Sequence, residues 1–215
     1  MGAVLDFSAT NGWGNVGGNW AQSVSTGAAT FEAWIRSTAK AGQTIVLGSN
    51  PPGARPRISI GDDQLSVYWN TGGSAPGWTS ADNTLVTDGQ WHHVAVVFDG
   101  GAITFYKDGA ATADRLTVGE AQQAAGTFQL AAGFGSVTGF TGELYDVRVW
   151  SVARSAQQIA SWRWAPLSLS EPGLTVRTSF DPARQQIINL VGGAAGSITW
   201  SLPCRMARSA FGGIT

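Results

Sequence analysis

The stretch QWHHVAVVFDG, residues 90–100, decides the fold class. It is rich in β-branched and aromatic residues and ends at a DG turn signal, which is typical of a strand entering a hairpin. His92 and His93 are the only histidines of the chain. Successive side chains of a strand point to opposite faces, so the two rings cannot bind one metal ion together. We interpret both as structural residues, while a site built on one histidine and distant partners stays open.

Turn signals recur at short spacing outward from this stretch. KDG at 107–109 closes a second strand over 102–107, and GDDQ at 61–64 separates two more. Further strands are expected over 29–37, 42–49, 126–134 and 142–150. Many short strands between turns that contain glycine or proline predict an all-β sandwich or barrel.

One helix is predicted over 155–162. Ser155 and Gln158 have the spacing of a capping box at its start. Ile159 and Trp162 share one face of this helix. We expect the helix to cover one end of the sandwich.

Composition narrows the class of partner. The chain has 215 residues, 13 basic and 14 acidic side chains, and a net charge of −1, which argues against nucleic acid and acidic membrane surfaces. No apolar stretch approaches the roughly 20 residues of a membrane helix, so no membrane insertion is expected. Cys204 is the single cysteine, which excludes an internal disulfide. No signal peptide is evident, so the sequence leaves the localisation unknown.

Three segments carry a family resemblance: TFEAWIRS (30–37), DGQWHHVAVVFDGGAITFYKDG (88–109) and GELYDVRVW (142–150). Their order and spacing resemble the laminin-G-like, concanavalin A-like domains of bacterial and pentraxin-related proteins, over about residues 4–162. The resemblance implies a jelly-roll sandwich of two antiparallel sheets, one of them concave. It also implies a binding role, most often toward carbohydrate, and an extracellular setting.

Beyond Trp162 the resemblance weakens. We expect residues 172–202 to return as edge strands of the same sandwich, which hides an edge that would otherwise invite aggregation. Residues 1–203 then form one domain and 204–215 a C-terminal tail. The tail is either loose or a contact in an oligomer.

The same fold carries laminarinase-type glycoside hydrolases, which need two carboxylates on one strand face. None of the four glutamates, Glu32, Glu120, Glu143 and Glu171, lies two or four residues from another carboxylate on a predicted strand. Glu143 and Asp146 are three apart, and a regular strand would place them on opposite faces. No motif of a nucleophile elbow, phosphate-binding loop or zinc protease is present. We therefore predict a protein that is not an enzyme.

A sugar site needs exposed aromatic rings and a few polar groups that orient hydroxyls. Trp34, Trp91 and Trp150 lie on strand positions of the family pattern and are interpreted as structural. Other tryptophans lie in or beside loops rich in glycine and asparagine, where a ring is harder to bury. The candidate ligand-binding residues are Trp13, Asn19, Trp20, Trp69, Asn70 and Trp78.

Alternation on two strands predicts which residues enter the core. The inward set is Phe31, Ala33 and Ile35 on one strand and Tyr145, Val147 and Val149 on the other. The opposite set is Glu32, Trp34 and Arg36 with Asp146, Arg148 and Trp150. Two uses of the charges stay open: cross-strand pairing, such as Glu32 with Arg148, or the polar lining of a groove.

The resemblance also implies a structural calcium ion, held here by Asp6, Asn11 and Asp146. Ser8 stands where the family often has an acid, which weakens this site. The leading hypothesis is a non-catalytic, lectin-like domain that binds a glycan or polysaccharide, with calcium. The alternative is a structural or adhesion module that makes protein–protein contacts, as in phage tails or tandem repeats.

Overall fold

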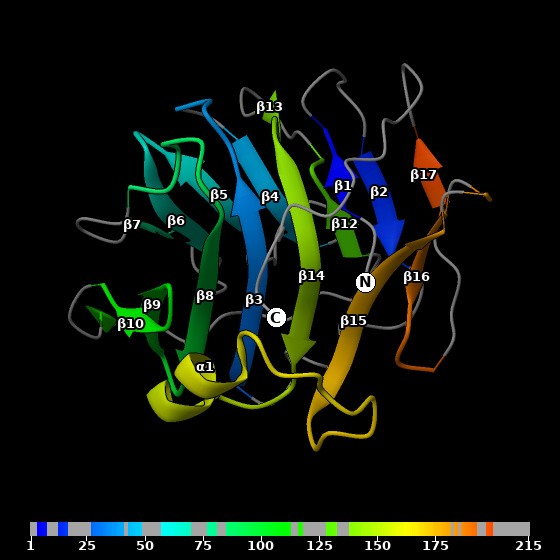
Figure 1. The fold of residues 1–215 in the computed structure, drawn as a ribbon. Helices are drawn as coiled ribbons and strands as arrows, with labels where there is room; N and C mark the ends of the chain where they lie inside the picture. Colours follow the sequence, from blue (N-terminus) through cyan, green and yellow to red (C-terminus); the bar gives the residue numbers. More distant parts are fainter. Residues whose placement is uncertain are drawn as a thin grey trace.

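Two antiparallel sheets pack face to face, with one helix against the front sheet (Figure 1). The structure, a computed structural model, describes residues 4–7, 13–16, 27–40, 43–48, 57–69, 77–80, 85–112, 116–117, 128–132, 138–181, 183–184, 186–192 and 197–199. This arrangement confirms the predicted all-β jelly-roll class. Within the described residues, no helix is long and apolar enough to span a membrane.

The first sheet contains the strand that starts with the two histidines. Its order is β10 (Ala110–Ala111), β9 (Ala102–Lys107), β8 (His92–Asp99), β3 (Ala28–Arg36), β14 (Glu143–Trp150), β15 (Leu174–Asp181) and β16 (Gln186–Asn189). Two short strands lie off this path: β1 (Leu5–Asp6) pairs with β14, and β11 (Leu116–Thr117) pairs with β9.

The second sheet lies behind the first in Figure 1. Its order is β17 (Ser197–Thr199), β2 (Trp13–Val16), β12 (Phe128–Leu130), β4 (Gln43–Gly48), β5 (Arg57–Gly61), β6 (Gln64–Trp69) and β7 (Gly77–Ser80). The short strand β13 (Thr138–Gly139) runs parallel to β4, whereas the other described pairings are antiparallel. Residues 172–202 thus supply β15 and β16 to the first sheet and β17 to the second.

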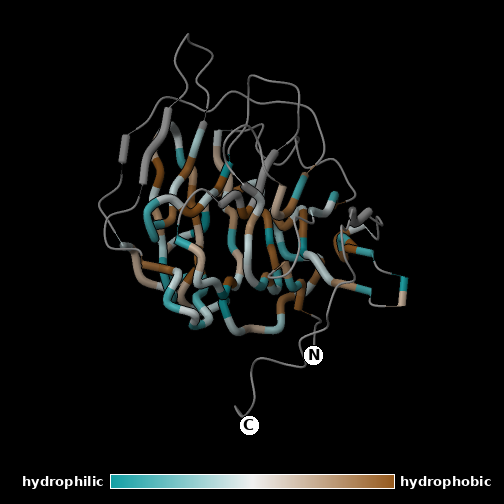
Figure 2. The backbone as a smooth tube through the Cα atoms, turned by 90° about the horizontal axis from the view of Figure 1, so that it is seen from above, coloured by the Kyte–Doolittle hydropathy of each residue, from teal (hydrophilic) through white to brown (hydrophobic). Residues whose placement is uncertain are grey.

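The core lies between the two sheets. Hydrophobic and hydrophilic segments alternate along the strands that enclose it (Figure 2). Phe31, Ala33 and Ile35 of β3 are buried there, as alternation predicts. On β8 the inward residues are Val94, Val96 and Phe98. Ala95 and Val97 face the other way and pack with Ile159 of the helix. The two histidines that begin β8 therefore belong to opposite faces.

The helix α1 (Ala156–Trp162) confirms the prediction from its capping residues. Ser155 is the N-cap, its side chain accepts a hydrogen bond from the backbone of Gln158, and the Gln158 side chain accepts one from the backbone of Ser155. These bonds satisfy amide groups that the first turn would leave without partners. Ile159 is fully buried, which attaches the helix to the first sheet.

A bulge in β14 overturns two predictions from regular alternation. The register against β3 shifts between Tyr145 and Arg148, and Asp146 has a φ of 47°. The extra residue puts Leu144, not Tyr145, into the core beside Val147. It also brings Glu143 and Asp146 to the same, outer face of the strand, where both meet arginine side chains.

Candidate functional site

The outer face of the first sheet is covered by the chain itself. Trp34 is 4% exposed and Arg148 is 2% exposed. The indole N–H of Trp34 donates to the carbonyl of Arg163, at 3.2 Å, and its ring centroid lies 4.0 Å from that of Trp164. The segment that follows α1 therefore fills this face, and a ligand groove around Trp34 and Arg148 is excluded.

A buried polar network lies beneath this cover. One carboxylate oxygen of Glu32 accepts a hydrogen bond from the Trp150 indole at 2.6 Å, and the other lies 3.2 Å from Nε2 of His93. Arg148 is the register partner of Glu32, and its Nη1 lies 4.0 Å from the carboxylate. Burial alone would raise the pKa of Glu32, but the hydrogen bond from His93 and the charges of His93 and Arg148 lower it. Cross-strand pairing is therefore confirmed, and these charges do not line an open groove.

The guanidinium group of Arg154 packs against two tryptophan rings, one on β14 and one on α1. Its guanidinium carbon lies 3.9 Å from the ring centroid of Trp150 and 4.2 Å from that of Trp162. A guanidinium between two indole faces gains cation–π and packing energy at once. Trp150 and Trp162 therefore hold β14 against α1, which is the structural role predicted for Trp150.

The remaining carboxylates of this face are also bound by arginines. Glu143 pairs with Arg36, and Asp146 accepts hydrogen bonds from Arg148 and from Arg177, whose Nε lies 2.8 Å away. Burial would raise the pKa of Asp146, but hydrogen bonds and charge from the two arginines lower it. Two guanidinium groups on one carboxylate do not suit calcium, which needs six to eight oxygen ligands.

The other residues of the calcium set are less fully described. Asp6 is the register partner of Glu143, and Asn11 lies outside the described residues. Among the residues that the structure describes, no group of three or more His, Cys, Asp or Glu side chains could hold a metal ion. The set of Asp6, Asn11 and Asp146 stays a prediction.

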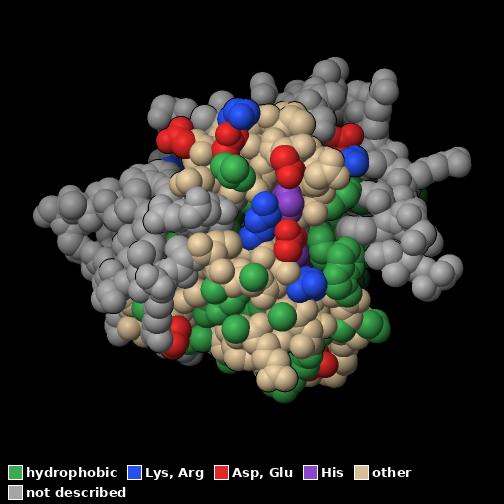
Figure 3. All heavy atoms as spheres, turned by 60° about the vertical axis from the view of Figure 1, so that its left-hand side comes forward, with side chains coloured by type: hydrophobic (Ala, Val, Ile, Leu, Met, Phe, Trp, Pro, Cys, Tyr) green, Lys and Arg blue, Asp and Glu red, His purple; other side chains and the backbone are tan. Residues whose placement is uncertain are grey.

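A second polar group ties a loop to the β8–β9 hairpin. The His92 ring contacts Asp108 at 2.8 Å through Nδ1 and Asp88 at 3.0 Å through Nε2. Lys107 donates to the carbonyl of Leu85 at 2.5 Å. Charged side chains of both signs gather on this side of the molecule (Figure 3). The two contacts to His92 fix its ring from both sides, which is a structural role.

The outer face of the second sheet is built differently. Ile58, Ile60, Leu65 and Val67 point into the core, so Arg57 and Tyr68 alternate to the outside. Register partners of an antiparallel pair share a face. One continuous row of register partners crosses the sheet: Ser197, Asn15, Gln129, Leu47, Arg57, Tyr68 and Trp78. We call these positions the cross-strand row.

Two pairs of side chains in this row are in contact. The guanidinium carbon of Arg57 lies 5.1 Å from the ring centroid of Tyr68, which is half-buried. Nε2 of Gln129 donates to Oδ1 of Asn15 at 3.1 Å, and both amides are half-buried. An aromatic ring offers an apolar surface, whereas guanidinium and amide groups donate or accept hydrogen bonds. The row therefore combines the two kinds of contact that a hydroxyl-rich, partly apolar ligand needs.

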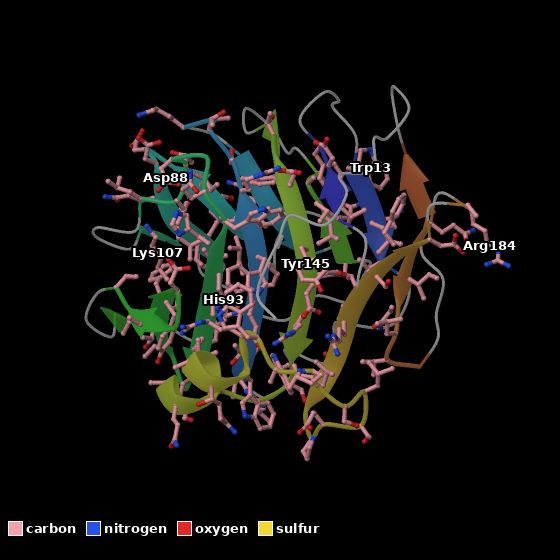
Figure 4. The ribbon with its side chains drawn as sticks, viewed as in Figure 1. Trp13, Asp88, His93, Lys107, Tyr145 and Arg184 are labelled. Atoms are coloured by element: carbon pink, nitrogen blue, oxygen red, sulfur yellow. The ribbon has the colours of Figure 1, made fainter. Side chains whose placement is uncertain are left out.

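The predicted site residues do not form one cluster. Trp78 is a member of the cross-strand row, and Trp69 ends β6 as the register partner of Gly77. Trp13 is half-buried on β2, two residues before Asn15, and lies far from Asp88 in Figure 4. Four strands, β12, β4, β5 and β6, separate β2 from β7. Asn19, Trp20 and Asn70 lie outside the described residues.

The sequence analysis identified Trp78 alone among the seven residues of the row and missed all four residues of the two contact pairs: Asn15, Arg57, Tyr68 and Gln129. A local signal existed for two of them, because Arg57 and Tyr68 alternate with the apolar residues of RISI and LSVYW. Asn15 and Gln129 carry no such signal. They belong to short strands whose pairing joins residues 114 positions apart.

Comparisons with known proteins agree with the geometry. A protein from Bacteroides ovatus whose proposed role is carbohydrate binding superimposes with a TM-score of 0.65 at 20% identity. The superposition covers 97% of this chain and 62% of the length of that protein. The heptameric SAP-like pentraxin of Limulus polyphemus gives 0.59 at 17% identity, over 94% of this chain and 97% of its own. Domains LG4-5 of the mouse laminin α1 chain give 0.57 at 14% identity, over 73% of this chain and 44% of their own.

The chain thus spans less than two thirds of the Bacteroides protein, and at these identities the likeness shows the fold. The family comparison is more direct. The model of the concanavalin A-like lectin/glucanase superfamily matches residues 10–160, which is more than half of the chain. The match includes the three segments that carry the resemblance in the sequence, and the protein belongs to the concanavalin A-like lectin/glucanase superfamily.

Proposed function

We propose that this protein is a non-catalytic carbohydrate-binding domain that holds its glycan on the outer face of the second sheet. The observation that carries the proposal is the cross-strand row, in which an aromatic–arginine pair and an amide pair lie at one register. Sugar rings stack on aromatic faces, and their hydroxyls take hydrogen bonds from polar neighbours. On the first sheet, α1 and the segment after it cover Trp34 and Arg148.

Arg57 prepares Tyr68 for this role. Its side chain is 6% exposed and packs against the tyrosine ring, which limits the rotamers that the ring can adopt. A ring already held in place loses little conformational entropy on binding. The proposed role of the Bacteroides ovatus protein in carbohydrate binding supports a glycan as the ligand in general, without identifying the residues that bind it.

The non-catalytic part of the proposal rests on the carboxylates of the first sheet. Glu143 and Asp146 share a face, as the two acids of a glycosidase would. Both are held by arginines, and Glu32 is buried against His93. A general acid needs a raised pKa, whereas the surroundings of Glu32 and Asp146 lower theirs.

A glycan array, run once with calcium and once with EDTA, tests the proposal. We expect the same glycans to bind in both conditions, because two arginines occupy the carboxylate of Asp146. Binding that EDTA abolishes and calcium restores would support the calcium-dependent form instead. Binding to no glycan in either condition, by a folded protein, would refute the proposal and favour a module for protein contacts.

The site is then tested by calorimetric titration with the glycan that binds best. Tyr68→Ala should lower its affinity at least tenfold without changing the melting temperature by more than a few degrees. Tyr145→Ala is the matched control, because Tyr145 is a half-buried tyrosine on the first sheet. Equal losses in the two variants, or none in Tyr68→Ala, would place the site elsewhere.

A further inference from the structure

We infer that Arg154, just beyond the end of β14, is the centre of a binding site for carboxylate anions. Arg154 is 5% exposed, yet its Nε and Nη2 atoms are buried without a hydrogen-bond partner. The two atoms lie on one edge of the planar guanidinium, so their N–H groups point in the same direction. Buried donors of a charged group are normally satisfied by the protein, by water or by an ion. The site lies at the first sheet, so it does not depend on the proposed glycan surface.

Two other arginines of the first sheet show what this edge of a guanidinium binds. Nε and Nη2 of Arg177 donate to the two carboxylate oxygens of Asp146, at 2.8 and 3.3 Å. Nε and Nη2 of Arg148 both donate to the same carboxylate. The planar fork of arginine matches the two oxygens of a carboxylate. Arg154 presents the same edge, and none of the ion pairs among the described residues includes it.

The guanidinium of Arg154 is held in place without a ligand. Its central carbon lies 3.9 Å from the ring centroid of Trp150 and 4.2 Å from that of Trp162. The backbone N–H of Arg154 donates to Oγ1 of Thr30 at 2.9 Å. These contacts are made where β14 ends beside α1 (Figure 1). A donor pair fixed in this way loses little conformational entropy when it binds an anion.

The charges around Arg154 favour an added anion. Burial lowers the pKa of the Arg154 guanidinium, while the charges of Glu32 and Glu171 raise it. The carboxylate of Glu32 is already in contact with Trp150 and His93. Glu171 acts on Arg154 through its charge, with no ion pair between the two. An anion on the Nε and Nη2 edge would therefore offset the cost of burying this cation.

The site lies close to the surface. Val152, two residues before Arg154, is 40% exposed, and Trp162 and Glu171 are half-buried. We expect a carboxylate to enter between side chains that already contact water. Because those side chains must move to uncover Nε and Nη2, binding should be weak.

Thermal melting with added acetate tests the site. Sodium acetate replaces sodium chloride at constant ionic strength, and we expect the melting temperature to rise by about 3 °C at about 100 mM acetate, because a ligand of the folded state stabilises it. Arg154→Lys keeps the charge but not the fork, and should lose this rise. Arg184→Lys, in an exposed ion pair with Asp181, is the matched control and should keep it. An equal rise in Arg154→Lys overturns the inference.

A nuclear magnetic resonance titration tests the fork in the unaltered protein. The Nε–H signal of Arg154 is identified by its proximity to the rings of Trp150 and Trp162. It should move saturably with acetate, whereas the Nε–H signal of the exposed Arg184 should not. This measurement decides the question even if Arg154→Lys fails to fold.

The same titration identifies the source of the carboxylate. Glucuronate carries a carboxylate on a sugar ring, and glucose is its neutral counterpart. Movement of the Arg154 signal with both acetate and glucuronate supports a site for carboxylates in general, and movement with glucuronate alone supports an acidic sugar as the ligand. No movement with either acid, or equal movement with glucose, overturns the inference.

Discussion

Glu32 on β3 and Arg148 on β14 are direct register partners, and their charged groups lie 4.0 Å apart with both side chains buried. His93 and Trp150 complete the surroundings of the same carboxylate. This pairing lies at the centre of the first sheet, under α1, where neither charge can reach water. The polar side chains at this point of the sheet are therefore paired with one another and buried under α1 and the segment after it.

Removing one partner of this network should be costly. Arg148→Ala leaves Glu32 without its register partner and removes two hydrogen bonds that Asp146 accepts, so we expect the free energy of unfolding to fall by roughly 3–5 kcal/mol. Urea denaturation measures the change. Arg184→Ala removes an exposed ion pair with Asp181 and should cost about 1 kcal/mol or less. Similar values for the two variants would show that the buried pair contributes little.

His92 should make stability depend on pH above about 6.5. The hydrogen bond to Asp108 raises the pKa of His92 above its ordinary 6.5, against the opposing effect of burial. The protonated ring is therefore favoured in the folded state. Its contribution is fully present below about pH 6.5 and is lost as the pH rises through the higher pKa of the folded protein. Melting temperature should fall over that range.

The same group predicts a loss of stability in acid. The backbone amide of Gln90 lowers the pKa of Asp88. Burial would raise the pKa of Asp108, but the hydrogen bonds from His92 and from the backbone of His93, with the charges of His92 and Lys107, together lower it. Their contribution is present above the ordinary value of 3.8 and declines as the pH falls through the lower folded value. His92→Gln should flatten the fall of the melting temperature above about pH 6.5, whereas Asp181→Asn should not. If the melting temperature of His92→Gln depends on pH as that of the unchanged protein does, His92 is not the cause of this dependence.

Truncation after Pro166 should abolish soluble expression. The lost residues include β15, which pairs with β14, and β16 and β17 at the edges of the two sheets. Without them β14 becomes an edge strand over its carboxyl-terminal half, and Val149 loses its neighbour Val176. The measurement is the soluble fraction and thermal melting of fragment 1–166. A soluble fragment with a cooperative transition would show that the segment is an appendage.

The tryptophans of the second sheet should differ in their effect on binding. Trp78 is the register partner of Tyr68, so Trp78→Ala should weaken glycan binding by about 1–3 kcal/mol, the scale of burying an aromatic ring. Trp13 lies on β2, and four strands separate it from Trp78 on β7, so Trp13→Ala should change glycan binding less. Calorimetric titration of both variants with the glycan that binds best checks this. A larger loss in Trp13→Ala than in Trp78→Ala would reverse the assignment.

Local patterns predicted much of the fold. Alternation on β3 assigned Phe31, Ala33 and Ile35 to the core, and the capping residues marked the start of α1. Both signals depend on residues a few positions apart, which is the range over which side-chain direction and helix capping operate.

The rest depended on contacts between distant segments. The bulge at Asp146 is stabilised by Arg177 from another strand, so nothing in GELYDVRVW by itself indicates the change of face. The cross-strand row requires the registers of six successive strand pairs, several of them far apart in sequence. The sequence analysis therefore selected tryptophans by their loops and missed Tyr68, which alternates with the core residues Leu65 and Val67.

The position of β17 has a consequence for how the protein is made. Residues 197–199 pair with residues 13–15, so one edge of the second sheet joins two segments far apart in the sequence. During synthesis β2 emerges early, and its partner β17 is made only after the other strands that the structure describes. Such non-local pairing slows folding and leaves β2 without that neighbour on the nascent chain. Closure of this edge is thus a late event in the folding of the sandwich.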